Sequence, residues 1–151
     1  MANLIPMNIR GRVLALDLGT VRVGLALSDA ARILATPYGT LMRGESDQEL
    51  IDQILKLVQV EEVSLLVVGM PRSLKVENSI AADRTGAFIK LLEQKSTVPV
   101  VNVDERFTTV LAERQLRESG HDSRSMKSKI DAVAATQILQ SFLDSKDNEK
   151  S

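Results

Sequence analysis

The run VLALDLGTVRVGLALS, residues 13–28, decides the fold of this chain. Residues 13–18 are apolar except at Asp17, a pattern typical of strands that are buried on both faces of a sheet. Residues 19–22 are typical of a turn and residues 23–28 of a second strand, so we expect a hairpin. A buried carboxylate without a partner is costly, so Asp17 either caps the turn or has a chemical role.

The rest of the chain alternates helical and strand patterns. We expect a third short strand at 32–35, stopped before Pro37 because a residue that precedes proline is conformationally restricted. Apolar residues recur at helical spacing in 47–60, where Ser46 or Asp47 can cap the helix. Further strands are expected at 63–68 and 98–103. Further helices are expected at 108–118, at 129–143 and at 79–95, the last with Ile80, Ala87, Phe88 and Leu91 inward. This order predicts an α/β fold with a mixed central sheet of about five strands flanked by helices.

Length and composition indicate one domain. The chain has 151 residues, a length that fits one domain. Hydrophobic residues make up 44% of it, which is enough for a core. Aromatic residues make up only 3%, which argues against aromatic base-stacking as the main way of binding nucleic acid. We expect a single domain over residues 11–143, between a flexible leader, 1–10, and a flexible polar tail, 144–151. The absence of cysteine excludes disulfides and thiolate metal sites. With no long apolar run and no signal-peptide pattern, we expect a cytoplasmic protein.

Acidic side chains on three separate elements are the main chemical signal. Asp17 interrupts the first strand, the pair Asp104 and Glu105 follows the strand at 98–103, and Asp131 begins an otherwise apolar stretch of helix. Taken singly, each acid is explained by a turn or by a helix cap. Taken together, carboxylates from separate elements are ligands that Mg²⁺ or Mn²⁺ prefers. Two such ions, about 4 Å apart, can support phosphodiester cleavage. His121 is the only histidine, and this chemistry requires none.

Basic groups near these acids are candidates for contact with nucleic acid. The overall net charge of −1 does not favour binding to nucleic acid. Residues 114–129, however, carry a local positive excess, with five basic residues and two acidic ones. A solvated loop is the alternative for each candidate. The residues expected to contact a nucleic-acid backbone are Thr20, Arg22, Arg72, Lys75, Arg106, Arg124 and Lys127.

Four blocks of the sequence resemble the YqgF/RuvX family. They are LDLGTVRVG (16–24) with SD (28–29), VVGMP (67–71), DERFTT (104–109) and DAVAA (131–135). The blocks stand in the family's order and span about residues 13–143. Members of the family are described as pre-16S rRNA nucleases and as Holliday junction resolvase-like proteins. Val21 stands where the family often has lysine, and residues 75–78 replace a loop that commonly contains glycine.

The resemblance implies an RNase H-like fold and cleavage at the 5′ end of pre-16S rRNA. It also implies that Asp17, one acid of the pair Asp104 and Glu105, and Asp131 bind metal and act in catalysis. Glu105 is favoured over Asp104 by analogy with related resolvases. The expected partner is RNA, and the chain is expected to be a monomer or a weak homodimer with no membrane association.

Three other functions stay open at this point. The same chemistry could resolve branched DNA, which usually requires a dimer. The turn at residues 19–22 also resembles the phosphate loop of actin-like ATPases, although those proteins need two lobes and 151 residues supply one. The fold could also serve as a noncatalytic nucleic-acid-binding module, which the intact set of acids disfavours.

Overall fold

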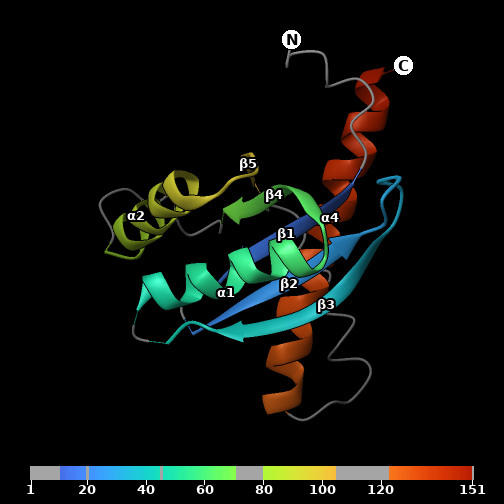
Figure 1. Ribbon diagram of the computed structural model, residues 1–151. Helices are drawn as coiled ribbons and strands as arrows, with labels where there is room; N and C mark the ends of the chain where they lie inside the picture. Colours follow the sequence, from blue (N-terminus) through green and yellow to red (C-terminus); the bar gives the residue numbers. More distant parts are fainter. Residues whose placement is uncertain (1–10, 20, 45, 71–79, 105–122, 151) are drawn as a thin grey trace.

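A five-stranded mixed sheet forms the centre of the computed structural model, which describes residues 11–19, 21–44, 46–70, 80–104 and 123–150. Side chains are described within these ranges except at 70, 80–83, 104, 123–131 and 146–150. The strand order is β3-β2-β1-β4-β5, with β1 antiparallel to β2 and parallel to β4 (Figure 1). The strands are β1 (Arg12–Leu18), β2 (Arg22–Ser28), β3 (Ala35–Met42), β4 (Val63–Met70) and β5 (Val100–Asp104).

The predicted hairpin of β1 and β2 is confirmed. Leu14 to Leu18 pair with Leu27 to Val23, and the turn is closed by the Gly19 N–H, which donates to the Arg22 carbonyl at 2.9 Å. A Cβ atom at Gly19 would lie 2.6 Å from the same carbonyl oxygen. Glycine is therefore the residue that permits this tight turn.

The predicted third strand at 32–35 is wrong. Residues 32–34 belong to the connection after β2, where Arg32 has a φ of 62°, and β3 begins only at Ala35. It then runs through Pro37, which pairs with Ala26 beside a register shift. Proline lacks the N–H that a ladder needs, but β3 pairs only with β2 and is an edge strand, where this loss is tolerated.

Two helices cover one face of the sheet. Helix α1 (Asp47–Val60) has the predicted bounds, and the Ser46 side chain accepts a hydrogen bond from the Glu49 N–H, which confirms the predicted cap. Helix α2 (Ile80–Lys95) also forms where predicted. Among its described side chains, those of Thr85, Phe88, Ile89 and Leu92 are buried in one stripe at helical spacing, and Leu91 is partly buried; the predicted inward side chain of Ile80 lies outside what the structure describes. The predicted inward position of Ala87 is wrong, because it lies off this stripe and is exposed.

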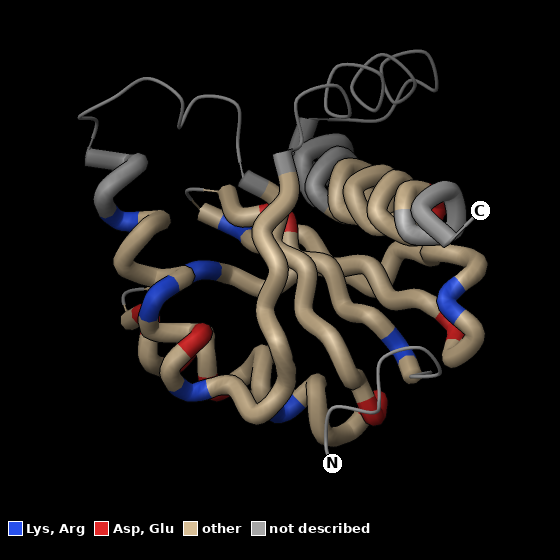
Figure 2. Tube along the Cα trace, turned by 90° about the horizontal axis from the view of Figure 1, so that it is seen from above, with Lys and Arg blue, Asp and Glu red and all other residues tan. Residues whose placement is uncertain are grey.

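Helix α4 (Ser123–Lys150) covers the opposite face of the sheet, as Figure 2 shows. It begins earlier than the predicted helix at 129–143 and continues past Leu143 to Lys150. The expected leader at 1–10 and the expected helix at 108–118 lie outside the described residues. In the part of the chain that the structure describes, no helix is long and apolar enough to cross a membrane.

Strand alternation divides the core into two layers. Leu14, Leu16 and Leu18 of β1 pack with α1 and α2, whereas Val13 and Ala15 pack with α4. Because successive side chains of a strand point to opposite faces, Asp17 is on the α4 face.

Candidate active site

The carboxyl ends of β1, β4 and β5 meet at one edge of the sheet. Asp17 is in register with Gly69 of β4, Gly69 is in register with Val103 of β5, and Met70 is in register with Asp104. Neighbouring strands lie about 4.8 Å apart, so the backbones of Asp17 and Asp104 are roughly 10 Å apart across the sheet. The backbones of Asp17 and Asp104 therefore lie at the same edge of the sheet, with β4 between them.

Glycine stands on both sides of Asp17. Gly24 of β2 and Gly69 of β4 are its register partners, and both glycines are buried. Register partners share a face of the sheet, so neither neighbouring strand presents a side chain beside the Asp17 carboxylate. Asp17 itself is partly exposed. The register partners of Asp17 therefore contribute backbone but no Cβ atom to its face of the sheet.

Helix α4 crosses the face on which Asp17 lies, and its direction follows from two contacts. Ala135 is fully buried in the same cluster as Ala15 and Ala26, which are paired in register. Further along α4, the Gln140 side chain accepts from the Ala35 N–H at 2.9 Å. Ala35 pairs with the end of β2, beside the start of β1, so the N-terminal part of α4 lies toward the end of β1.

This direction places the backbone of Asp131 toward Asp17. Asp131 precedes Ala135 by four residues, about one helical turn, on a helix whose buried residues Ala135, Ile138 and Leu139 face the sheet. Asp17 follows Ala15 by two residues along β1. The side chains of Asp104 and Asp131, and all of Glu105, lie outside what the structure describes. Among the described residues there is no group of three or more acidic or histidine side chains that could hold a metal, so the predicted cluster stays a prediction.

The predicted nucleic-acid contacts are described only in part. Arg22 begins β2, is partly exposed, and shares the face of Gly24 and Asp17 by strand alternation. Arg124 and Lys127 lie in the first turns of α4, where only the backbone is described. The remaining candidates, Thr20, Arg72, Lys75 and Arg106, lie outside the described residues.

Sequence reasoning missed Arg43. Its side chain is 6% exposed, and its Nη1 donates to the Gly19 carbonyl at 2.9 Å. Nothing in the run Leu41-Met42-Arg43-Gly44 distinguishes it from a surface arginine after an edge strand. Its burial could be predicted only if one knew that the connection after β3 packs against the turn that follows Asp17.

Comparison with known proteins agrees with this architecture. A protein of Mycobacteroides abscessus named "Putative pre-16S rRNA nuclease" is 45% identical over 136 residues, which cover 89% of this chain and 82% of the relative. One of the same name from Natranaerobius thermophilus is 37% identical over 138 residues, covering 91% and 97%. Thermus thermophilus RuvC, solved with a Holliday junction substrate, superposes with a TM-score of 0.56 at 14% identity, covering 89% of this chain and 95% of RuvC.

The RuvC superposition confirms the RNase H-like fold that the sequence predicted. The sequence profile of the RuvX family, described as "Holliday junction resolvase", matches residues 11–145. This match spans all five strands of the described sheet, helices α1 and α2, and helix α4 as far as residue 145. The chain therefore belongs to the RuvX family.

Proposed function

We propose that this chain is a metal-dependent nuclease that hydrolyses phosphodiester bonds at the 5′ end of pre-16S rRNA in the cytoplasm. Its catalytic, metal-binding acids would be Asp17, Glu105 and Asp131. The observation that carries the proposal is the placement of Asp17, a partly exposed carboxylate at the end of β1 between two register glycines. The names of relatives at 45% and 37% identity support RNA as the substrate.

The described side chains of β5, the strand that leads to the pair Asp104 and Glu105, alternate between the two faces of the sheet. Val101 and Val103 pack against the α4-side core, whereas Val100 packs against the opposite core. The odd-numbered positions of this strand therefore share the face of Asp17. Glu105 lies outside the described residues, and by analogy with related resolvases we infer that it is the metal ligand, with Asp104 as the alternative.

The donor set suits a hard divalent cation. Carboxylate oxygens are ligands of Mg²⁺ and Mn²⁺, and the chain has no thiolate that would favour a softer metal. When bound, such a cation lowers the pKa of water and offsets negative charge on the phosphate. The chain itself positions the carboxylates that would hold the cation. Asp17 lies on a central strand that is paired on both sides, and Asp131 lies on a helix that packs on the sheet through its buried alanines.

Basic residues, together with Thr20, would hold the substrate by its phosphate groups. Arg22 shares the face of Asp17 and can donate to a phosphate oxygen. Since phosphate contacts position a nucleic acid without reading its bases, these residues would set register along the strand. The full proposed set is Thr20, Arg22, Arg72, Lys75, Arg106, Arg124 and Lys127.

Single substitutions of the three acids test the proposal. Asp17→Asn, Glu105→Gln and Asp131→Asn should each reduce cleavage of a pre-16S rRNA 5′ end to background with Mg²⁺ or Mn²⁺, while thermal unfolding stays close to that of the parent. Asp52→Asn removes an exposed carboxylate from α1 and should cut normally. The proposal fails if all three acid variants cut at the parent rate.

Branched DNA is the second candidate substrate, because the family profile itself carries the description "Holliday junction resolvase". Resolution of a four-way junction requires paired cuts, and hence two active sites. A competition assay between four-way DNA and pre-16S rRNA separates the two candidates. A dimer mass together with preferential cutting of the junction would favour DNA, and a monomer that cuts RNA would favour rRNA processing.

A further inference from the structure

Arg43 is a buried cation beside the turn that follows Asp17. Its side chain is 6% exposed, and its Nε and Nη2 atoms have no hydrogen-bond partner among the described residues. A buried donor without a partner normally destabilises a fold. Both atoms are shielded from solvent, so they are not available to a substrate. The burial of Arg43 therefore needs an explanation other than direct contact with nucleic acid.

Two hydrogen bonds of Arg43 converge on that turn. Its Nη1 donates to the Gly19 carbonyl at 2.9 Å, and its backbone N–H donates to the Val21 carbonyl at 2.7 Å. One residue thus binds the carbonyl groups on both sides of Thr20. These two hydrogen bonds fix the peptide planes of the turn, and the turn begins two residues after Asp17.

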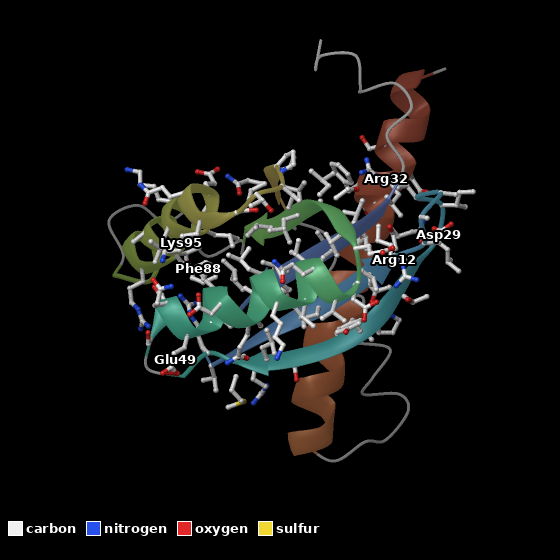
Figure 3. All side chains as sticks on the ribbon, in the orientation of Figure 1. Arg12, Asp29, Arg32, Glu49, Phe88 and Lys95 are labelled. Carbon is white, nitrogen blue, oxygen red and sulfur yellow. The ribbon has the colours of Figure 1, made fainter. Side chains whose placement is uncertain are left out.

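The Arg43 guanidinium also contacts helices α1 and α2. Its carbon lies 5.4 Å from the ring centroid of Phe88, which stands between α2 and α1 in Figure 3. Its Nη2 lies 3.8 Å from the Asp47 carboxylate at the start of α1. Phe88 is fully buried. Arg43 therefore connects the turn after β1 to the two helices that lie on the face opposite α4.

We propose that Arg43 is a positioning residue that fixes the turn at 19–22 and, through it, the end of β1 that carries Asp17. This inference rests on the proposed nuclease function. Arg43 does not touch the reacting groups, so its loss should lower kcat while KM for the nucleic acid changes little. Because two of its buried donors make no hydrogen bond with the described residues, replacing it with an apolar residue of similar length should cost little stability.

The first test compares Arg43→Met with Arg43→Lys. We expect Arg43→Met to speed hydrogen exchange of the Gly19 amide at least tenfold and to lower kcat at least tenfold. KM should stay within threefold and the unfolding midpoint close to that of the parent. Arg43→Lys keeps a donor for the Gly19 carbonyl and should restore kcat to within threefold. Lys90→Met removes an exposed cation from α2 and is the matched control. Parental exchange and kcat in Arg43→Met would overturn the proposal.

Gly19→Ala perturbs the same turn without altering Arg43. Its Cβ would lie 2.6 Å from the Arg22 carbonyl oxygen, so the turn must open. We expect a loss of kcat similar to that of Arg43→Met, and a double variant no worse than either single one. Fast exchange at residue 19 with parental kcat would overturn the proposal even if Arg43→Met did not fold. Hydrogen exchange needs no substrate, so it tests whether Arg43 holds the turn even if the chain shows no nuclease activity. Absence of activity would refute the proposed function alone.

Discussion

Enlarging Ala135 should disturb both stability and cleavage, because this residue is fully buried between α4 and the sheet. Ala15 and Ala26, paired in register, are fully buried in the same cluster. Ala135→Leu adds three carbon atoms where small side chains keep the helix close. Overpacking of this kind costs about 1–3 kcal/mol. A central value of about 2 kcal/mol lowers the Tm of a domain this size by about 6 °C.

The effect on cleavage should be larger than the effect on stability. Leucine at position 135 would push α4 away from the sheet, and Asp131 lies one turn away on the same helix. Since displacement of a catalytic group by about 1 Å can cost about 100-fold in rate, we expect a loss of that order.

Cleavage of a labelled pre-16S rRNA 5′ end is measured well below the Tm of the variant, and unfolding is followed by circular dichroism. Ser141→Leu makes a comparable enlargement at an exposed position of the same helix and should match the parent. Parental Tm and rate in Ala135→Leu, or equal losses in Ser141→Leu, would refute close packing of α4 as the source of the site's geometry.

Three further predictions concern the scaffold. Gln140→Ala leaves the Ala35 N–H without its acceptor and should cost about 1–3 kcal/mol in urea unfolding, whereas an unchanged midpoint would show that this link is dispensable. Ser46→Ala removes the α1 cap and should cost about 1 kcal/mol by the same assay; no loss would contradict the role of the cap. The Leu34 N–H, with further backbone donors, lowers the pKa of the Asp29 carboxyl below its ordinary value of 3.8. The ionised carboxyl therefore stabilises the fold above pH 3.8, and this contribution is lost as the pH falls through the lower pKa that Asp29 has in the folded protein. An NMR titration that gives Asp29 a pKa of 3.8 or higher would contradict this contact.

Periodic segments of the chain were predictable because their pattern and their packing agree. The run at 13–28 forms the expected hairpin, and α1 has the expected bounds and cap. In both segments the apolar positions that define the pattern are the residues buried in the core.

The errors arose where tertiary position overrides local preference. Pro37 was expected to end a strand, but at an edge its missing N–H is tolerated, so β3 extends to Met42. Ala87 is exposed because it lies off the stripe of α2 that packs inward, which includes Phe88 and Leu92. The burial of Arg43 depends on the meeting of the β1–β2 turn, α1 and α2, and no local pattern encodes such a meeting.

Part of the candidate site followed from the sequence through topology alone. An acid near the end of one strand and an acid at the end of another strand that runs parallel to it reach the same edge of the sheet, as Asp17 of β1 and Asp104 of β5 do on either side of β4. The glycines beside Asp17 could not be assigned to it from the sequence, because Gly69 lies 52 positions away and becomes its neighbour only through the pairing of β1 with β4.

Anomalous diffraction from crystals soaked in Mn²⁺ tests the shared metal site most directly. The account predicts a manganese peak bound jointly by the carboxylates of Asp17 and Asp131 and by an acid at 104 or 105. Ordered side chains of Asp17 and Asp131 that face separate surfaces, with no ion between them, would contradict it.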